Sequence, residues 1–136
     1  MTSTVKYLGN LRCEATHLAS GQTIITDAPL DNKGKGEAFS PTDIFATSLG
    51  ACALTIMGIA AAAHGINMEG ARAEVQKVMS LEPPRRVARI EVLFVMPALN
   101  YSEKQQKILQ NAAHTCPVSV SLGGSSVEIV EVFQWL

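Results

Sequence analysis

Two of the three cysteines in this chain stand where thiol chemistry is possible. Cys52 falls in the middle of a long apolar segment, where a helix dipole helps little and a nearby arginine would have to stabilise a thiolate. Cys116 directly precedes Pro117 at a predicted helix start, where free N–H groups favour an anion and lower the pKa of a thiol. Each could instead be structural, Cys52 as a small core side chain and Cys116 as a helix cap. Cys13 lies in a predicted strand and is interpreted as a buried bystander.

The other candidate ligands and loops predict neither a metal nor a cofactor. His114 and Cys116 could begin a metal site with Cys13 and His17, but this spacing matches no familiar zinc pattern. The glycine-containing stretches GKGE and LGGSS lack the strand-to-helix setting of a phosphate-binding loop. We therefore expect any chemistry to come from the cysteines themselves.

Composition places these cysteines in a small globular protein. The chain has 136 residues, which predicts one domain over residues 1–136. Hydrophobic residues make up 47% and charged residues 17%, so the chain is too apolar to be disordered. The net charge is −1 and no basic stripe is visible, which excludes nucleic acid as an expected partner. The N-terminus has no apolar signal segment, which predicts a cytoplasmic protein, and an odd cysteine count there argues against a disulfide framework.

A long helix is predicted to carry Cys52. Ser40 can cap it, Pro41 fits its first position, Asp43 can complete a capping box, and Gly65 ends it. One continuous apolar face is expected from residues spaced by three or four: Phe45, Leu49, Cys52, Ile56, Ile59 and Ala63. No Asp, Glu, Lys or Arg occurs from residue 44 to residue 68, which predicts burial on nearly all sides. The length is close to that of a membrane span, but the flanking strands could not then pair, so we expect a central buried helix and no membrane.

The remaining elements are expected to be strands and two further helices. Alternation and turn residues predict strands over residues 4–8, 11–17, 22–26, 71–81, 87–96 and 127–135. Ser102, with Gln105 three residues later, is expected to cap a second helix, and Pro117 to start a short third one. This order predicts the α+β class, with helices packed on an antiparallel sheet.

Two stretches of this sequence resemble the OsmC/Ohr family. Residues 40–55, SPTDIFATSLGACALT, are similar to that family's central helix, and residues 114–122, HTCPVSVSL, are similar to its second cysteine motif. The two motifs occur in the family's order and at about its separation, and the likeness covers nearly the whole chain. The resemblance implies an OsmC-like fold, in which antiparallel sheets pack around two central helices. It also implies an intertwined homodimer with active sites at the subunit interface.

The same resemblance implies a thiol-dependent peroxidase that reduces organic hydroperoxides. Cys52 would take the place of the peroxidatic cysteine and form a sulfenic acid. Cys116 would take the place of the resolving cysteine and close a Cys52–Cys116 disulfide, which an external thiol reductant would then open. Arg12, which taken alone is an ordinary surface charge, would match the arginine that pairs with the reactive thiolate.

This chain departs from the family at the residue that holds the arginine. The family has a glutamate where this sequence has Thr42, which cannot act as an anion. Asp43 and Glu37 are the candidate partners for Arg12, although helix capping alone would explain Asp43. The departure leaves an alternative open, in which the protein is a non-catalytic OsmC-like small-molecule-binding protein with structural cysteines. Thiol titration would separate the two readings, because buried structural cysteines are inert near neutral pH.

Overall fold

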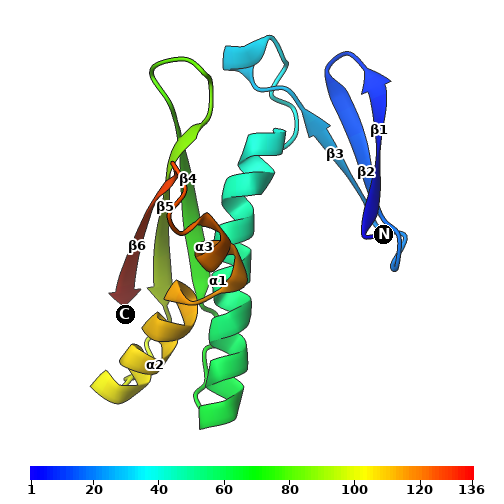
Figure 1. The fold of residues 1–136 in the computed structure, drawn as a ribbon. Coiled ribbons are helices and arrows are strands. Elements are labelled where there is room, and N and C mark those ends of the chain that lie inside the picture. The colour runs from blue at the N-terminus through cyan, green and yellow to red at the C-terminus, as the bar shows by residue number, and fades with distance from the viewer. The chain divides into compact units, whose positions relative to one another are not determined.

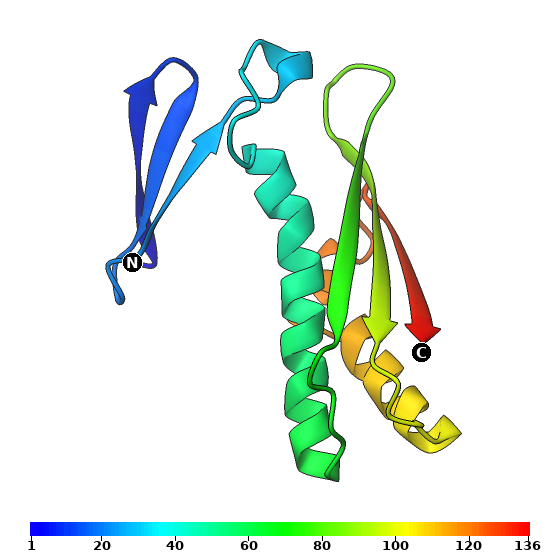
Figure 2. The ribbon, with the colours of Figure 1, turned by 180° about the vertical axis from the view of Figure 1, so that it is seen from behind.

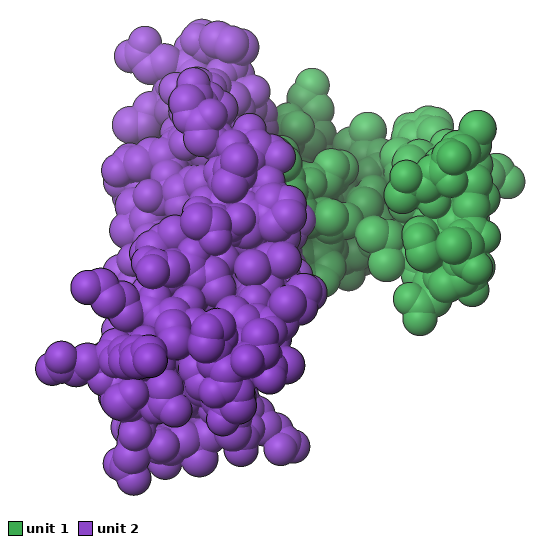
Figure 3. Space-filling model, turned by 60° about the horizontal axis from the view of Figure 1, so that its bottom comes forward, with its two compact units in different colours: residues 1–45 green, residues 46–136 purple.

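The computed structural model describes residues 1–136 and divides into two compact units (Figure 3). Unit 1 comprises residues 1–45 and unit 2 comprises residues 46–136. The mixture of strands and helices agrees with the predicted α+β class. That the two units fold as one domain stays a prediction.

Unit 1 is a three-stranded antiparallel sheet with little apolar core of its own. Its strands are β1 (Ser3–Gly9), β2 (Arg12–His17) and β3 (Thr23–Asp27), in the order β1-β2-β3. All three agree with the predicted strands to within one or two residues. The fully buried residues of the unit are polar, namely Thr26, Asp27 and Ser40. Packing of apolar side chains within the unit therefore does little to hold it together.

Helix α1 (Pro41–His64) begins and ends where the sequence predicts. Ser40 Oγ accepts a hydrogen bond of 3.0 Å from the N–H of Asp43, and the Asp43 carboxylate accepts one of 2.8 Å from the N–H of Ser40. This reciprocal pair is a capping box. At the other end Gly65 has a φ of 62°, the left-handed conformation that commonly terminates a helix.

The buried face of α1 differs from the predicted one. The buried residues are mostly small and form a narrow stripe: Ala46, Leu49, Gly50, Ala53, Met57 and Ala61. Phe45 and Ile59, which belong to the predicted face, are 39% and 63% exposed. Burial on nearly all sides is therefore wrong for the single chain, because its sheet covers only one side of the helix. By length and composition alone α1 could span a membrane, with a mean hydropathy of 1.9, but a core helix meets the same test.

Unit 2 packs its helices on one face of a second sheet. This sheet has the order β4-β5-β6, with β4 (Arg72–Met79), β5 (Val87–Met96) and β6 (Glu128–Trp135). Helices α2 (Glu103–His114) and α3 (Pro117–Leu122) connect β5 to β6 and lie on the same face as α1 (Figures 1 and 2). The expectation of a fully antiparallel sheet is wrong for β5 and β6, which pair in parallel. The crossover through α2 and α3 returns the chain to the end of the sheet from which β5 starts.

The core of unit 2 lies between α1 and the sheet. Alternate residues of β5 are at most 1% exposed and form the inward face of the strand, namely Ile90, Val92, Phe94 and Met96. Gly50 lets α1 approach the sheet closely, because a Cβ there would lie 2.8 Å from Cγ2 of Val75. This close approach places the middle of α1, which carries Cys52, against the core of unit 2.

Candidate active site

The structure brings Cys52 and Cys116 together in unit 2. Cys52 comes from the middle of α1 and is half-buried, and Cys116 comes from the start of α3 and is fully buried. Both are free thiols, and Cys52 is close enough to Cys116 to act directly on the pKa of its thiol. Two thiols that are close neighbours need little movement to form a disulfide.

Local structure at the α2–α3 junction places Cys116. The residue has φ −64° and ψ 148°, the extended conformation of an N-cap, and Pro117 fills the first helical position. Its Sγ accepts a hydrogen bond of 3.4 Å from the N–H of Ser119. The predicted cap at Cys116 is therefore present in the structure.

The pKa of the Cys116 thiol is raised, whereas the sequence predicted that it would be lowered. Removal from water is the largest influence and raises the pKa of the Cys116 thiol, and the neighbouring Cys52 raises it further. The N–H groups of Ser119 and Val118 act to lower it but are outweighed. The expected lowering at the helix start is thus wrong, because these two N–H groups offset less than burial costs. Cys116 is a protonated thiol near neutral pH and a poor nucleophile toward peroxide.

Arg12 is clamped between two carboxylates within unit 1. Its Nη2 lies 3.3 Å from Oδ2 of Asp27 and also contacts the Glu37 carboxylate. Asp27 is fully buried, and the N–H of Glu37 donates to its Oδ2 at 3.0 Å. This N–H and the Arg12 guanidinium hold the pKa of Asp27 below its ordinary value, although burial acts to raise it. Asp27 is therefore an anion at neutral pH, and the guanidinium is fixed from two sides.

Asp27 is the site residue that sequence reasoning missed, and a signal for it exists. Residue 27 lies just beyond the predicted strand 22–26, but it is the last residue of β3. Arg12 and Asp27 lie directly opposite each other in the β2–β3 ladder. A hairpin turning between Ala19 and Ser20 sets this register, so the cross-strand charge pair follows from the turn.

The other candidates near the start of α1 have local roles in the structure. The Asp43 carboxylate serves the capping box. Thr42 Oγ1 lies 3.2 Å from Ser40 Oγ. Glu37, one of the two acidic partners suggested for Arg12, contacts its guanidinium.

The predicted site residues fall in both units. Arg12, Asp27 and Glu37 belong to unit 1, whereas Cys52 and Cys116 belong to unit 2, so the pairing of Arg12 with Cys52 stays a prediction. Cys13 is half-buried opposite Tyr7, rather than fully buried as expected. No group of three or more His, Cys, Asp or Glu side chains is arranged to hold a metal ion.

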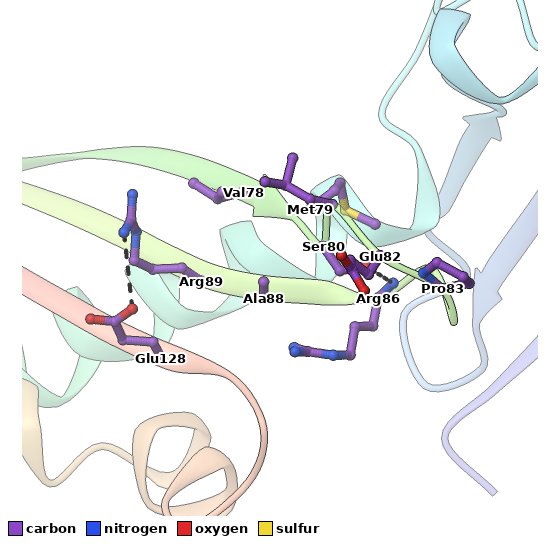
Figure 4. A pocket seen from close by; sticks show the side chains of 10 residues that line it. Val78, Met79, Ser80, Glu82, Pro83, Arg86, Ala88, Arg89 and Glu128 are labelled. Carbon is purple, nitrogen blue, oxygen red and sulfur yellow. Dashed lines mark hydrogen bonds and ion pairs between the residues drawn. The ribbon is translucent and has the colours of Figure 1, made fainter.

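A hollow beside the loop that joins β4 to β5 is a separate feature of unit 2. Its volume is about 430 Å³, and its charged lining includes Glu82, Arg86, Arg89 and Glu128. Figure 4 shows Arg89 and Glu128 reaching toward each other from neighbouring strands, with 4.0 Å between their charged atoms. The lining contains no cysteine and charges of both signs, so this hollow offers no thiol chemistry.

Comparison with protein families identifies the chain. The model of the OsmC-like protein family matches residues 34–131, which include both cysteine motifs. The chain therefore belongs to the OsmC-like protein family. No curated protein matches the sequence.

Solved structures with the same fold include close and distant relatives. A candidate osmotic stress induced and detoxification response protein from Psychrobacter arcticus 273-4 is 47% identical, with a TM-score of 0.92 over 98% of this chain and 96% of that one. An organic hydroperoxide resistance protein OsmC from Legionella pneumophila is 18% identical, with a TM-score of 0.77 over 98% and 97%. A candidate organic hydroperoxide resistance protein from Vibrio cholerae, with captopril bound in one of its active sites, is 13% identical, with a TM-score of 0.77 over 100% and 93%. The predicted OsmC-like fold is confirmed.

Proposed function

We propose that this member of the OsmC-like protein family is a thiol-dependent peroxidase that reduces organic hydroperoxides through Cys52 and Cys116. The observation that carries the proposal is the proximity of these two free thiols, which come from separate helices and interact with each other. The different burial of the two sulfurs supports different roles. The half-buried Cys52 can meet a substrate, whereas the buried, protonated Cys116 is suited to react with Cys52 alone.

The first step is reduction of the hydroperoxide at Cys52. The thiolate sulfur attacks one peroxide oxygen, so an S–O bond forms and the O–O bond breaks. The departing alkoxide takes up a proton and leaves as an alcohol. Two electrons pass from sulfur to the peroxide, and Cys52 becomes a sulfenic acid. The apolar residues around Cys52 on α1 favour organic hydroperoxides over the strongly hydrated hydrogen peroxide.

The second step is condensation of the two cysteines. The Cys116 sulfur attacks the sulfenic sulfur of Cys52, so an S–S bond forms and the S–O bond breaks. The Cys116 proton leaves with the hydroxide as water. An external thiol reductant then returns two electrons and two protons to open the disulfide.

Arg12 is the proposed electrostatic partner of the Cys52 thiolate. A guanidinium stabilises a thiolate and keeps it nucleophilic at neutral pH. The clamp by Asp27 and Glu37 supports this role, since it fixes the guanidinium before any substrate arrives. In this chain the two carboxylates do the work that the resemblance assigns to a glutamate at position 42.

A homodimer in the cytoplasm is the proposed working form. Apolar side chains remain uncovered in the single chain: Ile59 of α1 is 63% exposed, and Val5, Tyr7 and Ile24 of unit 1 are 52–67% exposed. A second copy of the chain would bury this surface. Sedimentation of the purified protein at micromolar concentration tests this, and a monomer would overturn it.

The experiment that tests the function is mass spectrometry of the reduced protein after one equivalent of cumene hydroperoxide, with hydrogen peroxide alongside. We expect a rapid Cys52–Cys116 disulfide that is absent in Cys52→Ser, with the organic peroxide reacting faster. If both thiols stay reduced while peroxide persists, the peroxidase proposal is wrong. The non-catalytic binding protein would then be the better reading.

A further inference from the structure

A buried carboxylate stands on the core side of the second sheet. Glu131 lies in β6 with a side chain that is 4% exposed, and it pairs with the buried Val92 of β5. Its neighbours on the same face of β6 are the apolar Ile129 and Phe133, since side chains alternate along a strand. An acid in an apolar layer destabilises the fold unless it is paired, so its presence calls for an explanation.

The partner of Glu131 is the last residue of α2. Nδ1 of His114 contacts Oε2 of Glu131, and the His114 ring meets Phe133 edge to face with its centroid 6.0 Å away. The ring is therefore held by a carboxylate and by an aromatic side chain of the same strand. Oε1 of Glu131 is buried without a hydrogen-bond partner, so the interaction with His114 is the main compensation for burying this acid.

The His114 member of this pair lies just before Cys116, the second cysteine of the candidate site. Only Thr115 separates His114 from Cys116, and both residues continue the hydrogen bonding of α2: the N–H of Thr115 donates to the carbonyl of Asn111 and that of Cys116 to the carbonyl of Ala113, each at 3.1 Å. Helix α3 itself has six residues, none of them fully buried, and so anchors Cys116 only weakly from the other side. The position of the Cys116 backbone thus depends on how the end of α2 is fastened to the sheet.

We propose that the His114–Glu131 pair is a positioning device that fastens the α2–α3 junction to β6 and holds Cys116 against Cys52. This inference rests on the proposed function, in which Cys116 must reach the sulfenic sulfur of Cys52. A disulfide forms only within a narrow range of separations and dihedral angles, so a small shift of the junction slows the condensation. Formation of the sulfenic acid takes place at Cys52 without Cys116, so it is not affected by the pair.

The test separates the two chemical steps in Glu131→Leu and His114→Ala. Glu131→Leu removes the buried acid, and the remaining His114 is 53% exposed, so water can solvate it and no uncompensated buried charge is left. A merely structural pair therefore predicts an unaltered rate of disulfide formation in a folded Glu131→Leu variant. The matched control is Glu128→Leu, which removes an exposed acid from the opposite face of the same strand. Thermal melts establish that each variant is folded.

The reduced proteins are mixed with one equivalent of cumene hydroperoxide, quenched over time with dimedone and analysed by mass spectrometry. We expect sulfenic acid at Cys52 to form at the wild-type rate, and the disulfide to form at least about tenfold more slowly in both variants but not in the control. Disulfide formation within twofold of wild type in both variants would overturn the inference while leaving the peroxidase intact. If wild-type protein gives neither sulfenic acid at Cys52 nor the Cys52–Cys116 disulfide, the proposed function fails, and the inference falls with it.

Discussion

Unit 1 holds Arg12 with charge, whereas unit 2 holds Cys116 with apolar packing. The guanidinium lies between two carboxylates in a thin sheet whose buried residues are polar. The thiol lies in a layered core, where burial keeps it protonated. A guanidinium is held in place best by carboxylates that stay ionised, whereas a thiol stays neutral where water is excluded from it. The two regions should therefore respond to different perturbations.

Removal of the charge on Arg12 should have the largest effect on activity. Arg12→Gln keeps the length and donors of the side chain but leaves the Cys52 thiolate without its cation, so we expect the rate of peroxide reduction to fall by about 100-fold. The measurement is peroxide consumption under single-turnover conditions. Arg72→Gln is the control, since this arginine is 61% exposed and pairs only with its neighbour Glu74. A rate within threefold of wild type in Arg12→Gln would show that the clamp of unit 1 serves no catalytic purpose.

Crowding the contact between α1 and the sheet should affect unit 2 next most strongly. In Gly50→Ala the new methyl group would meet Val75 Cγ2 at 2.8 Å, so we expect a loss of about 1–3 kcal/mol of unfolding free energy. Gly58→Ala is the matched control on the same helix, where a Cβ meets nothing within 4 Å. Better helix propensity should stabilise that variant by about 0.5–1 kcal/mol. Urea denaturation of both variants checks the prediction, and equal shifts would mean that the close approach at Gly50 is unimportant.

The contrast between the units also explains which parts the sequence could predict. Strand and helix positions in both units follow from alternation and capping residues, as the capping boxes at Ser40 and Ser102 show. The parallel pairing of β6 with β5 could not be predicted from alternation and capping residues, because strand direction depends on the path of the crossover through α2 and α3.

The candidate site was predictable where it depended on a local motif. The Cys116 cap follows from the adjacent Pro117, but the acidity of its thiol depends on burial by distant elements and was predicted with the wrong sign. Asp27 and Glu131 were missed, although Asp27 lies opposite Arg12 in the β2–β3 register and Glu131 lies between Ile129 and Phe133 in the alternation of β6. An acidic residue at an otherwise apolar position of a strand therefore predicts a buried, paired carboxylate.

Neutralising Asp27 should weaken the clamp of unit 1 without removing Arg12. We expect Asp27→Asn to lower the peroxide-reduction rate by about tenfold, and Glu37→Gln by less, since Glu37 is 58% exposed and Asp27 is buried. Because the folded-state pKa of Asp27 is lowered, its contribution to stability is full above the ordinary aspartate pKa near 3.9 and is lost as the pH falls through the folded value. Urea denaturation at pH 5 and pH 3 should show that the unfolding free energy falls less in Asp27→Asn than in wild type. An equal fall in both proteins would mean that other carboxylates cause the loss of stability in acid.

The smallest expected effect is in unit 2, where stability should fall at alkaline pH rather than at acid pH. Burial raises the folded-state pKa of Cys116, so its contribution to stability is full below the ordinary thiol pKa near 8.5 and is lost as the pH rises through the folded value. The stability difference between wild type and Cys116→Ser, measured by urea denaturation under reducing conditions, should therefore narrow between pH 7.5 and pH 10. Cys13→Ser is the control, because that thiol lies in unit 1 and is half-buried. A difference that widens with pH would mean that Cys116 is held as a thiolate, and the division between a charged unit 1 and a neutral unit 2 would be wrong.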